Sequence, residues 1–213
     1  MTWHIQLSCF EGALAIDLPG HPEGSGFSTI EEYADSVDEY IKKNHIESPV
    51  LVGHSMGGAI AIECALRDQN LAGIVLVGTG ARLRIHPDIL SKLKENYEEA
   101  CRLVASWSLS PNSDPIIRDR ILNEMLKVKP DITYNDFAAC DRFDRMFSVE
   151  RISLPTLVIC GADDKLTPVK YSQYLQSRIR NSKLIVIRGA GHMVMLEKPR
   201  LVNEAIEAFL DGL

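Results

Sequence analysis

A serine between two glycines is the feature of this sequence best suited to chemistry. The pentapeptide Gly-His-Ser-Met-Gly at 53–57 follows the apolar run 50–52 and precedes a run of small residues. A strand, a glycine-flanked serine and a helix form the G-x-S-x-G nucleophile elbow, which raises the serine hydroxyl above the end of a sheet. We predict that Ser55 is a nucleophile, on a turn so tight that only glycine fits at Gly53 and Gly57. The alternative is a glycine-rich strand-to-helix turn with an incidental serine.

A serine hydroxyl becomes a good nucleophile only when a base takes its proton, and near neutral pH that base is a histidine held by a carboxylate. His192 follows the Gly-Ala-Gly turn 189–191, directly after the strand pattern 184–187. The carboxyl ends of parallel strands share one edge of a sheet, so His192 should lie on the side of Ser55. His54 points away from the nucleophile, and we predict a packing role for it. The remaining histidines lack metal-ligand spacing and are predicted to be solvent-exposed: His4, His21, His45 and His86.

Two neighbouring aspartates could hold the histidine. Asp163 and Asp164 follow the strand pattern 156–160 and the turn residue Gly161. We prefer Asp164, which lies three residues past that glycine and just before the helix start at 167–168. Asp163 is the fallback, since its position is more typical of a turn or helix-cap carboxylate. The three proposed groups then follow one another in the order Ser55, Asp164, His192.

Continuous β-branched runs indicate how these groups are positioned. Such runs are typical of parallel strands covered by helices on both faces. A capping box at 28–32 predicts the start of a helix, and further helices are expected at about 58–66 and 199–210. The predicted strands are 13–16, 50–52, 74–77, 156–160 and 184–187.

The middle of the chain interrupts this alternation of strands and helices. Residues 82–150 contain no strand signal, so we predict a helical insertion between the third and fourth of these strands. The core is then expected to comprise 1–81 and 151–213. Three helical patterns occupy the insertion, at 89–106, 115–127 and 134–146.

Composition narrows the functional classes. The 213 residues are 46% hydrophobic and carry a net charge of −6, which fits one acidic domain and argues against nucleic-acid binding. No apolar run approaches the roughly 18 residues of a membrane helix, and the first residues do not resemble a signal peptide. The five cysteines are scattered singly with no C-x-x-C, which predicts a cytoplasmic protein without a zinc site. We expect no metal and no cofactor.

Four stretches carry a family resemblance: 17–21, 53–58, 155–164 and 189–199. Through them the chain resembles the α/β-hydrolase superfamily, in the branch of small esterase-like and lactonase-like enzymes with a helical cap. The resemblance implies an α/β fold with a mostly parallel sheet flanked by helices and an inserted helical cap. It also implies roles for four residues: Ser55 as nucleophile, Asp164 as acid, His192 as base and the Met56 backbone N–H as an oxyanion donor.

The resemblance implies a serine hydrolase that cleaves a small carboxylic ester, thioester or lactone through an acyl-enzyme. Cofactor-free peroxidase chemistry and C–C bond hydrolysis on the same triad remain open. The alternative from another class is a non-catalytic or weakly active protein whose pocket holds a small ligand. Five side chains could line an apolar pocket, although such residues are more often ordinary core contacts: Leu103, Trp107, Met125, Phe143 and Phe147.

The start of the chain departs from the family pattern. No His-Gly loop precedes Ser55, and residues 1–3 resemble the beginning of a helix that follows the first strands in family members. By typical strand and loop lengths, about 30 residues with three strands are absent, so the sheet should have a gap or pair differently. The missing loop would supply a second oxyanion donor, whose loss typically costs about a hundred- to a thousandfold in turnover. We hypothesise a shortened form of a longer enzyme, with a start misplaced at an internal methionine; the rival hypothesis is a natural short protein with little activity.

Overall fold

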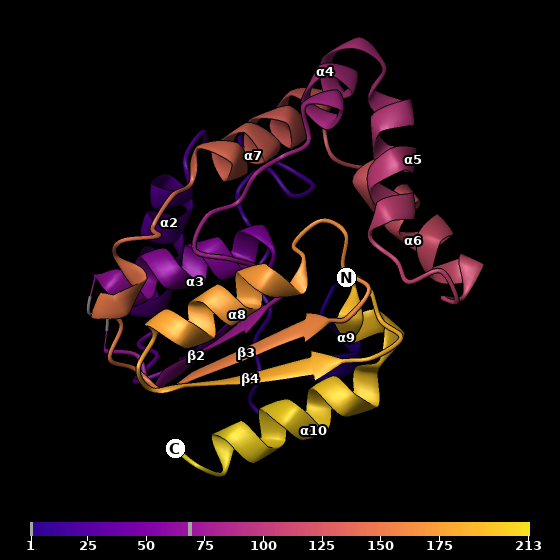
Figure 1. The fold of residues 1–213 in the computed structure, drawn as a ribbon. Coiled ribbons are helices and arrows are strands. Elements are labelled where there is room, and N and C mark those ends of the chain that lie inside the picture. Colours follow the sequence, from indigo (N-terminus) through magenta and orange to yellow (C-terminus); the bar gives the residue numbers. More distant parts are fainter. Residues whose placement is uncertain (1, 68–69) are drawn as a thin grey trace.

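One parallel sheet organises the molecule. The computed structural model describes residues 2–67 and 70–213. Within them four strands form a single sheet in the order β1-β2-β3-β4, and every neighbouring pair is parallel (Figure 1). The strands are β1 Val50–His54, β2 Gly73–Val77, β3 Thr156–Gly161 and β4 Ser182–Ile187.

The central strands are buried on both faces. In β2, Ile74 and Leu76 join the hydrophobic cluster on one side of the sheet, whereas Val75 and Val77 join the cluster on the other. All five residues of β2 and all six of β3 are buried. This double burial explains why these strands consist of continuous apolar runs rather than alternating polar and apolar residues.

Helices cover the two faces of the sheet. One cluster contains residues of α2, α3 and α8, and the other contains residues of α9 and α10. Figure 1 shows α10 on the opposite side of the sheet from α3 and α8. The expected parallel sheet flanked by helices is therefore confirmed. The helices of this core are α1 His4–Leu7, α2 Ile30–Lys43, α3 Met56–Leu66, α8 Val169–Arg178, α9 Val194–Glu197 and α10 Pro199–Leu210.

The predicted strand at 13–16 is wrong. These residues have no regular structure, and the Leu14 side chain is 67% exposed. A short apolar run becomes a strand only where another strand is available for hydrogen bonding. β1 ends the described sheet and pairs only with β2, so the four described strands are contiguous and leave no gap.

Residues 82–150, which we call the helical insertion, consist mainly of helices that lie apart from the sheet, whereas Phe143 and Val149 near its end join the core cluster. In Figure 1 the helices α4, α5, α6 and α7 lie above the sheet, with α5 and α6 on the side to which the strands point. Its helices pack around a small cluster that includes Ile89, Leu93, Ala100 and Val104. The elements between β2 and β3 are α4 Pro87–Glu95, α5 Tyr97–Trp107, α6 Pro115–Met125, α7 Pro130–Arg142 and the 3₁₀ turn η1 Val149–Arg151.

Two helix boundaries differ from those expected. The pattern 89–106 is two helices, because Asn96 leaves the helical conformation and its side chain accepts a hydrogen bond from the Glu99 N–H. Pro130 lies between the helices expected at 115–127 and 134–146, but it is the first residue of α7, where its missing N–H costs nothing. The predicted capping box is present between Thr29 and Glu32 at the start of α2.

A histidine–carboxylate pair joins the core to the insertion. His21 Nε2 lies 2.9 Å from Oδ2 of Asp136 in α7, and its Nδ1 lies 3.2 Å from the carbonyl oxygen of Pro19. The Tyr33 hydroxyl donates to the other Asp136 oxygen at 2.6 Å. Both ring nitrogens of His21 face acceptors, and only the protonated ring donates through both. The hydrogen bond to Asp136 raises the pKa of His21, against a smaller lowering by burial.

This pair predicts a pH-dependent stability. A histidine pKa raised by folding contributes stability that is fully present below its unfolded value near 6.5 and is lost as the pH rises through the folded value. The stability advantage of the wild type over His21→Gln should therefore be largest near pH 5.5 and shrink towards pH 9. Thermal unfolding across this range measures it, with exposed His45→Gln as the control. A difference that does not vary with pH would contradict the assignment.

Candidate active site

Ser55 occupies a strained turn between a strand and a helix. β1 ends at His54 and α3 begins at Met56, and Ser55 between them has φ 52° and ψ −115°. Its N–H donates to the Val77 carbonyl at 3.0 Å, and its own carbonyl accepts from the Thr79 hydroxyl at 2.8 Å. A non-glycine residue in this region costs on the order of 1–3 kcal/mol, and such strain is concentrated at functional sites.

The glycines around Ser55 do not all serve the same purpose. A Cβ atom at Gly53 would lie 2.1 Å from the Gly57 carbonyl oxygen, so the backbone approach requires glycine there. A Cβ at Gly58 would lie 2.5 Å from a Thr79 methyl carbon. At Gly57 it would meet nothing within 4 Å. The prediction that only glycine fits two residues after the serine is therefore wrong, because that Cα faces open space.

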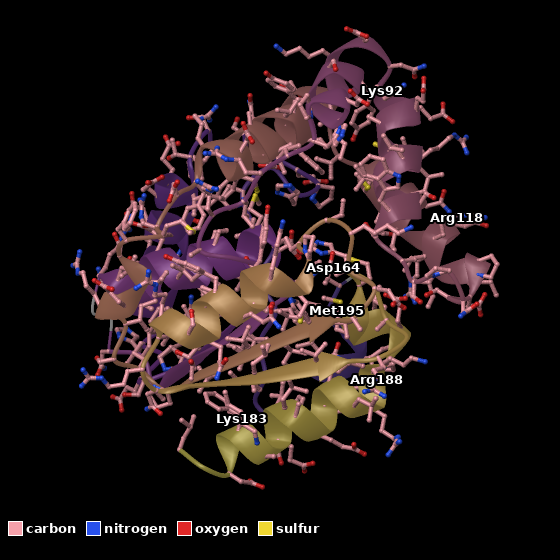
Figure 2. The ribbon with its side chains drawn as sticks, in the orientation of Figure 1. Lys92, Arg118, Asp164, Lys183, Arg188 and Met195 are labelled. Carbon is pink, nitrogen blue, oxygen red and sulfur yellow. The ribbon has the colours of Figure 1, made fainter. Side chains whose placement is uncertain are left out.

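Asp164 and His192 are hydrogen-bonded to one another. Asp164 follows β3 and His192 follows β4, and Nδ1 of the ring lies 2.9 Å from Oδ2 of the carboxylate. Figure 2 shows Asp164 at the carboxyl end of β3, on the side of the helical insertion. The other Asp164 oxygen accepts from the N–H groups of Leu166 and Thr167 at 2.9 and 2.8 Å. Asp164 and His192 are each only 5% exposed.

The surroundings of Asp164 keep it ionised. Burial by itself would raise its pKa, but the nearby His192 and the hydrogen bonds that it accepts outweigh burial and lower the pKa overall. The Thr167 hydroxyl donates to Oδ2 at 2.8 Å and lies 3.1 Å from Nδ1 of the ring. A carboxylate only accepts, so Nδ1 of His192 is the donor in its bond to Asp164, and in a neutral ring the unprotonated nitrogen is then Nε2.

Ser55, Met56 and His192 all line one large cavity of about 1490 Å³. Within the described part of the chain, no hydrogen bond joins the Ser55 hydroxyl to the His192 ring. Met56 is the first residue of α3, so its backbone N–H has no partner within the helix. The structure therefore pairs Asp164 with His192 directly, and it places Ser55 and Met56 at the cavity that His192 also lines.

The chain matches a known family over nearly its whole length. The model of the alpha/beta hydrolase family matches residues 2–205. The chain belongs to the alpha/beta hydrolase family. It is similar to a thermophilic esterase of known structure, with 42% identity and a TM-score of 0.91, over 99% of this chain and 84% of that one.

Named relatives agree with this membership. A pimeloyl-[acyl-carrier protein] methyl ester esterase of Neisseria meningitidis serogroup A is 27% identical, over 93% of this chain and 68% of its own length. The uncharacterized hydrolase YugF of Bacillus subtilis is 28% identical, over 92% of this chain and 79% of its own length. The chain is a hydrolase.

Two neighbours of the pair in this hydrolase have other partners. No described hydrogen bond joins Asp163 to the His192 ring; its carboxylate accepts from the Ser110 hydroxyl at 2.7 Å, and its N–H donates to the Ala190 carbonyl at 2.9 Å. His54 Nε2 lies 3.0 Å from the His192 carbonyl oxygen. Burial, assisted by the nearby His192, lowers the pKa of His54 to about 3. A neutral His54 therefore donates from Nε2 and holds the backbone of His192, a role that sequence reasoning reduced to packing.

The other histidines divide into two groups. His45 and His86 are exposed, as expected. His4 and His21 are half-buried, so that expectation is wrong for them: His4 lies 3.3 Å from an Arg120 nitrogen, and His21 binds Asp136. No described group of three or more histidine, cysteine, aspartate or glutamate side chains could hold a metal ion.

The cavity of the hydrolase is lined by residues of both the core and the insertion, many of them apolar. Of the expected lining residues, Trp107 and Met125 do line it. Leu103 instead packs within the insertion, Phe143 is buried in the core and Phe147 is 90% exposed. Other lining residues that sequence reasoning did not single out are Ile89, Val104, Phe137 and Leu166.

Among the described helices, none combines the length and the apolar run needed to cross a membrane.

The two glycines of the elbow make a matched pair of variants. Gly53→Ala should destabilise the fold by about 3 kcal/mol, since a Cβ there strikes backbone that has no room to move. Gly57→Ala should be neutral or stabilise by up to about 1 kcal/mol, because alanine is the better helix former. Urea unfolding of both variants measures the difference. Equal losses of stability would contradict the description of this turn.

Proposed function

We propose that this hydrolase cleaves a small carboxylic ester, thioester or lactone through an acyl-enzyme on Ser55. The observation that carries the proposal is the buried hydrogen bond between Asp164 and His192 beside a cavity that Ser55 also lines. The strained backbone of Ser55 and the N–H of Met56, which has no partner within α3, support it. The thermophilic esterase and the methyl ester esterase among the relatives support the substrate class.

In this proposal the Ser55 oxygen attacks the ester carbonyl while His192 Nε2 takes the hydroxyl proton. Asp164 holds the ring in the tautomer that exposes Nε2 and stabilises the imidazolium that forms. The Met56 N–H, at the positive end of α3, donates to the developing oxyanion. His192 then returns the proton to the leaving group, and water releases the acid by the same steps.

We propose that the helical insertion acts as a cap that selects the substrate. Its side chains Ile89, Val104, Trp107 and Met125 line the same cavity as Ser55 and would contact an apolar part of the substrate. Apolar walls with a few convergent polar groups are typical of small-molecule sites. These apolar side chains would favour an uncharged acyl or alkyl group in the part of the substrate that contacts them.

A weakly active or non-catalytic ligand-binding protein is the second candidate. One observation favours it: no hydrogen bond joins the Ser55 hydroxyl to the His192 ring among the described residues. That arrangement is common in enzymes without substrate, where such contacts tighten only when the complex forms.

A panel of short-chain nitrophenyl esters, thioesters and lactones tests the proposal. Ser55→Ala, His192→Gln and Asp164→Asn should each lower kcat by about 10³- to 10⁴-fold, since each removes one part of the proton relay. The matched controls are exposed His45→Gln and Asp119→Asn, which should retain wild-type rates. Activity that survives Ser55→Ala would contradict the mechanism. A folded wild type that binds but hydrolyses nothing on the panel would favour the ligand-binding candidate.

A further inference from the structure

Glu197 joins two loops that are distant in the sequence. It is the last residue of α9, and its Oε1 accepts from the N–H of Gly191 at 2.7 Å, next to His192. Its Oε2 accepts from the N–H of Ser110 at 2.9 Å and from the Ser113 hydroxyl. The carboxylate therefore bonds at once to the loop of the proposed base and to the segment between α5 and α6.

That segment, residues 108–113, is in close contact with the loops of both Asp164 and His192. The Ser108 carbonyl accepts from the Met193 N–H at 3.1 Å, and the Ser110 hydroxyl donates to Asp163, the residue before Asp164. A Cβ at Gly191 would lie 2.7 Å from the Ser110 nitrogen, so the backbones touch there. Segment 108–113 thus fixes where the His192 loop can lie.

The environment of Glu197 is unlike that of a surface carboxylate. In the described structure it has no ion pair, and backbone N–H groups and one hydroxyl are its partners. Hydrogen bonds to an ionised acceptor are shorter and stronger than neutral ones. A glutamine of the same shape has only one acceptor oxygen, so one of the two backbone N–H groups would then face an NH₂ donor.

We propose that Glu197 is a positioning residue for His192. It fixes the position of the His192 loop relative to the segment between α5 and α6. The inference rests on the proposed function, in which His192 is the base. Glu197 itself touches neither substrate nor reacting atoms. A displacement of about 1 Å in a catalytic group can cost about 10²-fold in rate, so the loss of one anchor should reduce kcat.

The test compares Glu197→Gln with two matched variants. Glu204→Gln changes a glutamate of α10 that is exposed and bonded to Arg200 one turn away. Ser113→Ala removes only the hydroxyl partner and leaves both backbone bonds to Glu197. Glu197→Gln should lower kcat by about 10- to 100-fold with KM changed less than threefold, whereas both matched variants should stay within threefold of the wild type.

Proton NMR supplies a readout that does not depend on turnover. The Nδ1–H of His192, bonded to Asp164, should give a low-field resonance that disappears in Asp164→Asn. It should shift or broaden in Glu197→Gln and stay in place in Glu204→Gln. If the wild type hydrolyses nothing, the proposed function fails, and this resonance alone decides the positioning role.

A Glu197→Gln protein with wild-type kcat and an unmoved resonance would overturn the inference. If its unfolding temperature is nevertheless lower, Glu197 is merely structural. If Glu197→Gln does not fold, Glu197→Asp shortens the same link by one methylene, and the same kcat loss and the same resonance shift are expected.

Discussion

The site depends on one buried hydrogen bond, between the carboxylate of Asp164 and Nδ1 of His192. A buried carboxylate is costly unless its oxygens are satisfied, and here two backbone N–H groups and the Thr167 hydroxyl complete its partners. The two residues meet because β3 and β4 are parallel neighbours whose carboxyl ends lie at one edge. The sheet, its flanking helices and the loops after these strands therefore all serve to hold one imidazole beside the cavity.

Much of the fold could be predicted because strands buried on both faces consist of continuous apolar runs, which are visible in the sequence. The runs at 74–77 and 156–160 are apolar on both faces, and only a covered parallel strand requires that. The run at 13–16 looks similar but has no strand beside it, and strand pairing is a property of the whole fold that a local pattern does not contain. The break at Asn96 is not predictable from the continuous apolar period at 89–106, because a single capping residue ends the helix within it.

The candidate site was likewise predictable only in part from the sequence. Its main groups follow strands directly, so the order of Ser55, Asp164 and His192 along the chain was enough to suggest them. The hydrogen bonds of His54 and Glu197 could not be predicted from the sequence. Their partners are backbone groups up to 138 residues away, and no residue spacing indicates such partners. Gly53 and Gly57 look equivalent in the motif, yet a Cβ at Gly53 would lie 2.1 Å from a backbone oxygen, whereas one at Gly57 would meet nothing within 4 Å. Three-dimensional proximity, rather than residue type, separates these cases.

The central claim is that Ser55 is the group that His192 activates. Peptide mass spectrometry after exposure of the folded protein to a fluorophosphonate tests it most directly, since the reagent bonds covalently to an activated serine. The account predicts a single adduct on the peptide that contains Ser55, formed much more slowly in His192→Gln. An adduct confined to another residue, or none on folded protein, would contradict it.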